Sequence, residues 1–287
     1  MAEARPLGAP GTAALAFVLL SFALNSVVTR LVVGGGLLDP GLATVARFVA
    51  GALMLALVAL ARGRPRDARP GRRSVAPALW LGAYALLISY GYAHIGAAAG
   101  TFVFYALVLA TMTAGGALMD RKAPPWRAIA GGLLALAGVG VLALGRLAGT
   151  TPLGVALLAG TGVAWGAYSL HGRRQPDAFA FSAGNFALLA LALLPLGGAL
   201  LAAGAAWTAR GALLAIAMGA LTTALAYVAW YRLLPAIPSA QAATYQMLIP
   251  VLAAGIAVAA LGEPLSWRFA LAAALVLGGM ALAGLRR

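Results

Sequence analysis

The sequence contains no cysteine, only 6 acidic residues and few charged residues of any kind. Its 287 residues are 63% hydrophobic and 9% charged, with a mean hydropathy of +0.96. The lack of cysteine excludes disulfides, thiolate nucleophiles and cysteine-ligated metals. Because soluble domains are roughly 25% charged, the polar side chains here are too few to cover a globule. The composition excludes soluble and disordered proteins and predicts an all-α integral membrane protein.

Carboxylates are also absent from the interior of the apolar segments. Their positions, all in tails or connections, are Glu3, Asp39, Asp67, Asp120, Asp177 and Glu263. A carboxylate in hydrocarbon usually serves ions, protons or cationic substrates, so a carboxylate-based proton/drug antiporter is disfavoured. We find no nucleotide-binding motif, no nucleophile–base pair and no metal cluster at depth. We therefore expect no enzymatic activity, no cofactor and no metal, and a neutral or zwitterionic substrate.

Ten apolar runs have the length of about 20 residues that a membrane-spanning helix needs. They do not alternate apolar and polar residues as the strands of a transmembrane barrel do. The runs lie near residues 12–33, 41–61, 74–94, 97–119, 126–145, 152–172, 178–203, 210–231, 238–261 and 267–285. The sequence thus predicts ten transmembrane helices.

The basic residues fall mainly on one side of these spans. The basic side has the cluster between Arg62 and Arg73, together with Arg5, Arg121, Lys122, Arg127, Arg173, Arg174, Arg232, Arg286 and Arg287. The other side has only Arg146, Arg210 and Arg268. This is the positive-inside pattern. It places both termini in the cytoplasm. The net charge of +14 is thereby explained without a nucleic-acid partner, which would need a polar module.

The two halves of the chain repeat several features. Trp126 and Trp267 each open a span with a following arginine, and a glycine lies twelve residues beyond each, at Gly138 and Gly279. Asp39 lies eight residues before Arg47-Phe48, and Asp177 lies eight before Asn185-Phe186. We interpret residues 1–148 and 149–287 as two five-helix units. An odd number of spans inserts the second unit upside down, and such inverted repeats enclose a central substrate cavity in transporters.

This layout resembles the EamA-type transporters of the drug/metabolite transporter superfamily, and within it most closely the bacterial aromatic amino-acid exporters. The resemblance is carried by Arg47-Phe48, Trp165-Gly166, Pro250, Gly262-Glu263-Pro264 and Gly278-Gly279. The first half departs from the pattern, with Phe22-Ala23 where Trp-Gly is usual. The resemblance implies export of small organic metabolites, with aromatic amino acids as the first candidates, by alternating access that is facilitative or weakly proton-coupled.

Other functions and partners stay open at this point. The alternatives are a nucleotide-sugar or multidrug carrier of the same fold and, less favoured, an intramembrane enzyme. The expected partners are a small-molecule substrate and membrane lipid. The oligomeric state is undetermined, and a monomer is compatible with the sequence.

Nine polar or aromatic side chains within the spans are the predicted substrate-binding residues. A tyrosine hydroxyl or an amide in a membrane needs a polar partner that lipid does not supply, and a central wet cavity would supply one. For the amides, a bond to a neighbouring helix is the other interpretation. The nine residues are Asn25, Tyr84, Tyr90, His94, Tyr105, Trp165, Tyr168, Tyr245 and Gln246.

Two arginines also lie within the first two spans. Arg47 is seven residues inside its span, and it either snorkels to the surface or captures a substrate carboxylate. Arg30 is nearer to the surface, and we expect it to snorkel.

Overall fold

The computed structural model describes residues 8–92, 94–95, 97–144, 150–261 and 266–284. Within these residues, ten helical segments are long and apolar enough to cross a membrane, so the predicted all-α, ten-span architecture is confirmed. The α-helices are α1 Ala9–Thr29, α2 Pro40–Ala61, α3 Arg72–Gly91, α4 Ala97–Asp120, α5 Trp126–Ala143, α6 Pro152–Arg173, α7 Ala178–Ala202, α8 Ala209–Ala217, α9 Ala226–Leu233, α10 Ser239–Gln246, α11 Leu248–Leu261 and α12 Trp267–Gly284. Short 3-10 helices follow α2 (η2, Pro65–Ala68) and α9 (η4, Leu234–Ala236).

Two spans consist of more than one helix. A π-helical segment, η3 (Met218–Leu225), joins α8 to α9, and another, η1 (Arg30–Gly34), continues α1. The ninth span breaks at Met247, between α10 and α11. Pro250 has no N–H to donate to the Gln246 carbonyl, which explains the break.

The third span is shorter than predicted. The expected segment 74–94 ends at Gly91, so His94 lies in the following turn and not in the helix. The turn is held by Thr151, whose backbone N–H and hydroxyl both donate to the His94 carbonyl, at 3.0 and 2.9 Å. These bonds satisfy the His94 carbonyl outside the helix.

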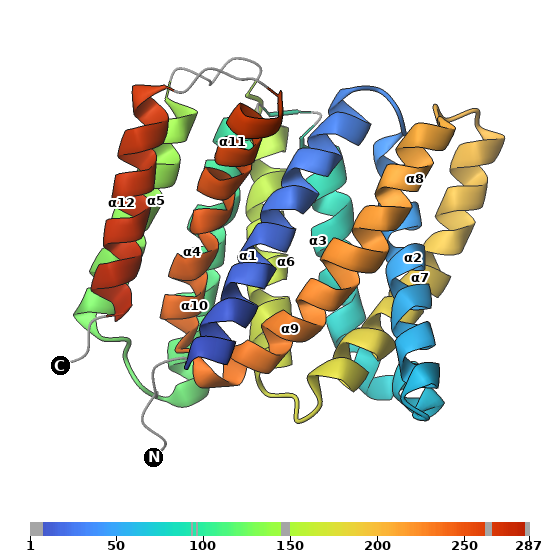
Figure 1. Ribbon diagram of the computed structural model, residues 1–287, viewed down its shortest axis with the longest axis horizontal. Helices are drawn as coiled ribbons and strands as arrows, with labels where there is room; N and C mark the ends of the chain where they lie inside the picture. The colour runs from blue at the N-terminus through green and yellow to red at the C-terminus, as the bar shows by residue number, and fades with distance from the viewer. Residues whose placement is uncertain (1–7, 93, 96, 145–149, 262–265, 285–287) are drawn as a thin grey trace.

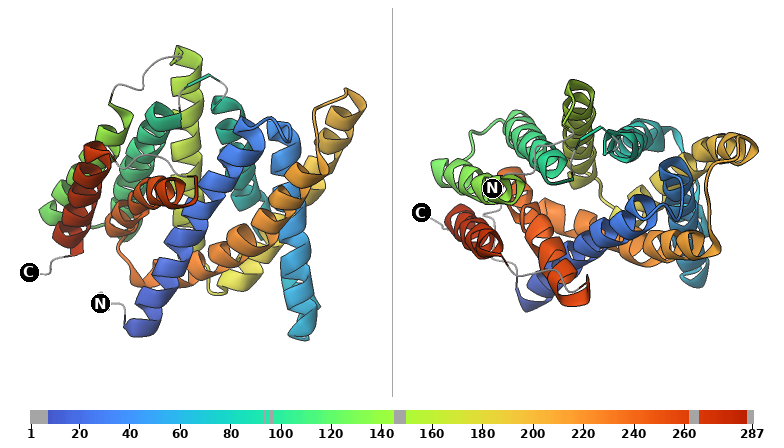
Figure 2. Two further views of the ribbon diagram at one scale, coloured as in Figure 1. Left: turned by 45° about the horizontal axis from the view of Figure 1, so that its top comes forward. Right: turned by 90° about the horizontal axis from the view of Figure 1, so that it is seen from above.

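The helices surround a central space. Seen from above, α4, α6 and α3 form one row, and α11, α1 and α8–α9 form the facing row (Figure 2). The α5–α12 pair closes one end of the bundle, and α2 and α7 close the other (Figure 1). The start of α1 and the end of α12 lie at the same end of the bundle (Figure 1), called the terminal face below. The other end, with the α1–α2 and α3–α4 connections, is the distal face.

The α5–α12 contact joins equivalent positions of the two halves. A Cβ atom on Gly131 would lie 2.5 Å from the Gly279 carbonyl oxygen, and one on Gly279 would approach the Gly131 carbonyl as closely. Only glycine permits this backbone approach. Gly131 lies five residues after Trp126 and contacts Gly279, which lies twelve residues after Trp267. Conversely, Gly138 lies twelve residues after Trp126 and contacts Ala272, which lies five residues after Trp267. A two-fold axis in the membrane plane produces such exchanged offsets.

Matching residues of α2 and α7 behave alike. Asp39 and Asp177 both cap their helices, each carboxylate accepting two backbone N–H bonds of 2.8 to 3.1 Å. Nine residues after each aspartate, Phe48 and Phe186 pack together, with ring centroids 5.3 Å apart. The predicted boundary between the two units, at residues 148 and 149, lies outside the described residues, as does the Gly262-Glu263-Pro264 motif.

Candidate substrate cavity

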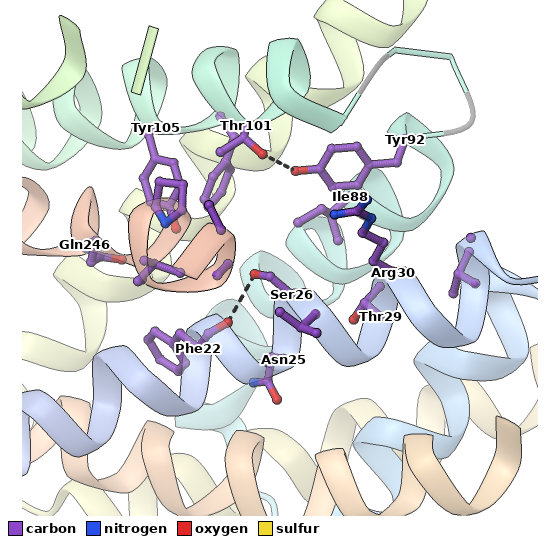
Figure 3. Close-up of a pocket in the computed structure, with 18 of the residues that line it drawn as sticks. Phe22, Asn25, Ser26, Thr29, Arg30, Ile88, Tyr92, Thr101, Tyr105 and Gln246 are labelled. Atoms are coloured by element: carbon purple, nitrogen blue, oxygen red, sulfur yellow. Dashed lines mark hydrogen bonds between the residues drawn. The ribbon is translucent and has the colours of Figure 1, made fainter. Parts of the chain in front are cut away.

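A cavity of about 660 Å³ lies between the two helix rows, in the distal half of the bundle. Its walls come from the distal halves of α1, α2, α3, α4, α5, α11 and α12 and from the middle of α6 and η3–α9. Figure 3 shows part of this lining, with Phe22, Ser26 and Thr29 of α1 on one side and Tyr105 and Gln246 on the other. The volume accommodates a small organic metabolite.

The floor of the cavity is a tryptophan–glutamine pair. The Trp165 Nε1–H donates to Gln246 Oε1 at 2.5 Å, and the Gln246 amide nitrogen in turn donates to Met112 Sδ and the Ala242 carbonyl. Tyr84 packs on Trp165, with ring centroids 5.0 Å apart. Trp165 is 3% exposed. The pair is therefore a rigid, fully bonded platform between α6 and α10.

One wall of the cavity is polar. It comes from α1 with η1, from α2 and from the distal end of α3, and it consists of Asn25, Ser26, Thr29, Arg30, Thr44, Arg47, Ser89 and Tyr92. Thr44 and Ser89 hydroxyls are 2.6 Å apart, and Tyr92 bonds Thr101 of α4 at 3.1 Å (Figure 3). These bonds orient the wall.

The opposite wall is mostly apolar. It comes from α5, α11 and α12 and consists of Val139, Leu142, Ile249, Pro250, Ala253, Ala254, Val258 and Phe269, with Ser266 and Arg268 beside them. A cavity with one polar and one apolar wall suits an amphipathic ligand, because each part of the ligand meets a matching surface.

Three arginines line the cavity, and no described lining residue is acidic. They are Arg30, Arg47 and Arg268. The Nε–H groups of Arg47 and Arg268 are buried without a hydrogen-bond partner among the described residues. The Arg47 guanidinium lies 4.7 Å from the centroid of the Phe48 ring. The cavity is thus electropositive, with guanidinium donors available to an anionic group.

Arg30, which we expected to snorkel to the surface, is exposed and also lines the cavity. Its side chain is directed from the end of α1 toward Ile88 and Tyr92, across the cavity (Figure 3). Depth along the span does not reveal the rotation of the helix about its axis. Arg30 is four residues after Ser26 and eight after Phe22, so all three share one helix face.

Five of the nine predicted residues line the cavity: Asn25, Tyr84, Tyr105, Trp165 and Gln246. The Asn25 amide also joins α1 to η3. Its nitrogen donates to the Thr222 carbonyl at 3.2 Å, and its oxygen accepts from the Thr222 hydroxyl. Both interpretations of this amide therefore apply, since it bonds a neighbouring helix at the cavity wall.

The other four predicted residues lie outside the cavity. Tyr90 is 44% exposed, and His94 is exposed in the α3–α4 turn. Tyr245 is half-buried, and its hydroxyl accepts from Gln241 at 2.7 Å. Tyr168 is fully buried on the terminal side of Trp165. Tyr90 is adjacent to the lining residue Ser89 but on another face of α3, whereas Tyr168 lies one turn beyond Trp165 toward the terminal face.

The path is closed on the terminal side of the Trp165–Gln246 floor. There Arg173, at the end of α6, donates to Asp120 at the end of α4 and to Ser239 at the start of α10, at 2.7 and 3.0 Å. Arg174 donates to the Met119 carbonyl at 2.6 Å. These bonds tie the ends of α6, α4 and α10 together at the terminal face, whereas the cavity extends to the distal ends of α1, α2 and α12.

Comparison with known proteins agrees with this architecture. The model of the EamA-like transporter family matches residues 152–285. A Pseudomonas aeruginosa protein, PA1977, is 39% identical over 269 residues, which is 92% of this chain and 91% of that protein. The chain belongs to the EamA-like transporter family. It is therefore a multi-pass membrane transporter of small molecules.

A solved structure is also similar in fold. A protein known from its crystal structure superposes with a TM-score of 0.80 at 22% identity, over 96% of this chain and 97% of that one. At this identity the likeness concerns the fold alone. The family thus accounts for the ten-span architecture, and the choice of substrate depends on the cavity.

Proposed function

We propose that this EamA-family chain carries small organic metabolites that bear a carboxylate, amino acids among them and aromatic ones first. The observation that supports this proposal is the cavity lining, with three arginines and no described acidic residue. Guanidinium groups bind carboxylates through charge-assisted, often bidentate hydrogen bonds. The same charge repels a permanently cationic drug, which disfavours a multidrug carrier.

The two walls of the cavity support the aromatic preference. A carboxylate held by Arg30 or Arg47 leaves the rest of the ligand beside Ile249 and Phe269 of the apolar wall. Hydroxyl oxygens such as those of Ser26 and Thr29 accept hydrogen bonds from a substrate ammonium group. An aromatic amino acid has this division between a zwitterionic head and a flat apolar body.

Transport is proposed to occur by alternating access across a bacterial inner membrane, outward and either facilitative or weakly proton-coupled. The distribution of basic residues supports cytoplasmic termini, which makes the terminal face the cytoplasmic one. The conformation described here, open distally, is then outward-facing. Exchange between this state and one open at the terminal face moves the substrate.

Arginines also match phosphate groups, so a nucleotide-sugar carrier is the second candidate. It needs a larger polar surface than this cavity presents, because the sugar, ribose and phosphates are all hydrophilic. The apolar wall of α5, α11 and α12 has few donors or acceptors for them.

The test is counterflow of labelled tryptophan in proteoliposomes, with competitors that differ in one group. Indole-3-propionate keeps the carboxylate and lacks the ammonium group, whereas tryptamine does the opposite. We expect tryptophan, phenylalanine and indole-3-propionate to compete and tryptamine to be at least tenfold weaker. Equal competition by tryptamine would refute the carboxylate requirement, and exchange of a nucleotide sugar but no amino acid would favour the second candidate.

A further inference from the structure

A cluster of buried polar side chains lies on the terminal side of Trp165, in the closed half of the bundle. Tyr168 and Ser169 of α6, Asn185 of α7 and Tyr231 of α9 are each at most 1% exposed. The Tyr168 hydroxyl faces Asn185 and Tyr231, and the Tyr231 hydroxyl faces Ser169. Yet their side-chain oxygens and the Asn185 nitrogen make no hydrogen bond of ordinary geometry with any described residue. We call these four residues the terminal-side cluster.

Such a cluster is unusual for a region whose only role is to pack. Buried donors and acceptors without partners are costly, and within a membrane neither lipid nor bulk water relieves the cost. Aromatic rings fill the space around the cluster. Phe181 stacks on Tyr168 at 5.5 Å, and Tyr227 lies 6.2 Å from Tyr168. Apolar side chains of the same shape would close this region better.

The repeat connects the cluster with the open cavity. Phe22-Ala23 stands where the second half has Trp165-Gly166, and four residues later the two halves have Ser26 and Ser169. Ser26 lines the cavity and Ser169 belongs to the cluster. Arg47 and Asn185 likewise lie eight residues after the capping aspartates, one in the cavity and the other in the cluster.

Ring contacts give a third correspondence. Phe22 packs on Tyr227 at 5.6 Å as Trp165 packs on Tyr84 at 5.0 Å, so the two tyrosines occupy equivalent places. Four residues beyond them are Ile88, in the cavity, and Tyr231, in the cluster. Residues of three different helices in the cavity therefore have their repeat counterparts in the cluster.

We propose that the terminal-side cluster is a second, uncharged substrate compartment, collapsed in this conformation and opened to the terminal face when the cavity closes. This inference rests on the proposed carrier function. Its polar atoms face one another here without hydrogen bonds of ordinary geometry, because their partners, water and the substrate, are present in the other state.

The second compartment differs from the cavity in charge. The counterpart of Arg47 is the neutral Asn185. The counterpart of Arg30, eight residues after the Phe22 and Trp165 positions, is Arg173, which is already bonded to Asp120. A carboxylate substrate thus meets the guanidinium groups of Arg47 and Arg268 in the cavity, whereas the four residues of the terminal-side cluster offer it only neutral donors, so it binds more weakly there.

Single-cysteine labelling tests the compartment directly, because the chain has no native cysteine. The test variant is Ser169→Cys, and Ser26→Cys is the reference in the open cavity. The matched control is Val276→Cys on α12, which is equally buried but packs against Gly138 of α5, away from the path. Oriented membrane vesicles are treated with a membrane-impermeant maleimide from either face.

We expect Ser26→Cys to react from the distal face, and Ser169→Cys to react from the terminal face at least tenfold faster than Val276→Cys. Tryptophan supplied on the distal side should accelerate the Ser169→Cys reaction, because it drives the alternation. Should Ser169→Cys fail to fold, Asn185→Cys on α7 carries the same expectations. The proposal would be overturned if Ser169→Cys and Asn185→Cys both reacted from the terminal face no faster than Val276→Cys.

The outcome separates this inference from the carrier proposal, since labelling requires no particular substrate. Terminal-face labelling in a protein that exchanges no carboxylate would retain the compartment and refute the proposed substrate class. Carboxylate exchange without such labelling would retain the proposed substrate class and refute the second compartment.

Discussion

The two halves of the proposed path, on either side of Trp165, are built from equivalent helices but differ in charge. The distal half is open and lined by Arg30, Arg47 and Arg268. The terminal half is closed over neutral polar groups and aromatic rings, and Arg173 at its end is paired with Asp120. The difference follows from the cost of dehydration. Burying a neutral polar group without a hydrogen-bond partner costs a few kcal/mol of free energy, whereas burying an unpaired charge costs far more.

The difference has a consequence for the transport cycle. On the proposed mechanism, the distal half also closes during each cycle and removes Arg47 from water. A bound carboxylate neutralises the guanidinium in that step, but an empty carrier buries it unpaired. We therefore expect exchange of substrate across the membrane to be much faster than net efflux, which requires the empty carrier to return.

The largest expected effect comes from making the two halves alike with Arg47→Asn. The loss of hydrogen bonds to a charged group is worth about 1.5–3 kcal/mol, or roughly 10- to 150-fold in affinity, and tryptophan exchange should fall accordingly. The ratio of exchange to net efflux should also fall toward one, because the empty carrier no longer buries a cation. Arg210→Asn, an exposed position at the start of α8 outside the cavity lining, should leave both rates unchanged. An unaltered ratio in Arg47→Asn would contradict the neutralisation argument.

An intermediate effect is expected at the boundary between the halves. Trp165→Phe keeps a ring on the floor but removes the Nε1–H, which leaves Gln246 Oε1 without its donor. A buried acceptor left unpaired costs about 1–3 kcal/mol, so we expect a lower melting temperature and roughly tenfold slower exchange. Trp126→Phe, exposed at the start of α5, is the matched control for thermal unfolding and for counterflow. Equal behaviour of the two variants would exclude Trp165 from the site.

The smallest effect concerns the closure of the terminal half. Asp120→Asn weakens the bridge from α4 to Arg173 of α6, and because such partly exposed pairs are worth at most about 1 kcal/mol, the closed state should lose only a few-fold in population. Labelling of Ser169→Cys from the terminal face should accelerate by about two- to fivefold. Asp67→Asn breaks a bridge of similar length to Arg64 within one connection of that face and should have no effect. Slower labelling in Asp120→Asn would show that the bridge does not hold the closed state.

The ten spans were predictable because each depends on about 20 consecutive residues and on the hydrocarbon around them. The break before α11 was predictable for a similar reason, since Pro250 acts on its own helix. Site residues were predictable only where polarity coincided with the right helix face. Trp165 and Gln246 met that condition, whereas Tyr90 has the same chemistry and faces away from the cavity.

The sequence by itself therefore determined the membrane environment and the number of helices, both of which depend on local composition and spacing, and it predicted the duplication. Only the tertiary structure decided that Arg30 and Arg47 share a cavity with Arg268, and that Tyr168 and Asn185 lie buried on the other side of Trp165. The physical reason is that the rotation and crossing of helices follow from close packing between distant segments, as at Gly131 and Gly279. That packing sets which side chains meet water.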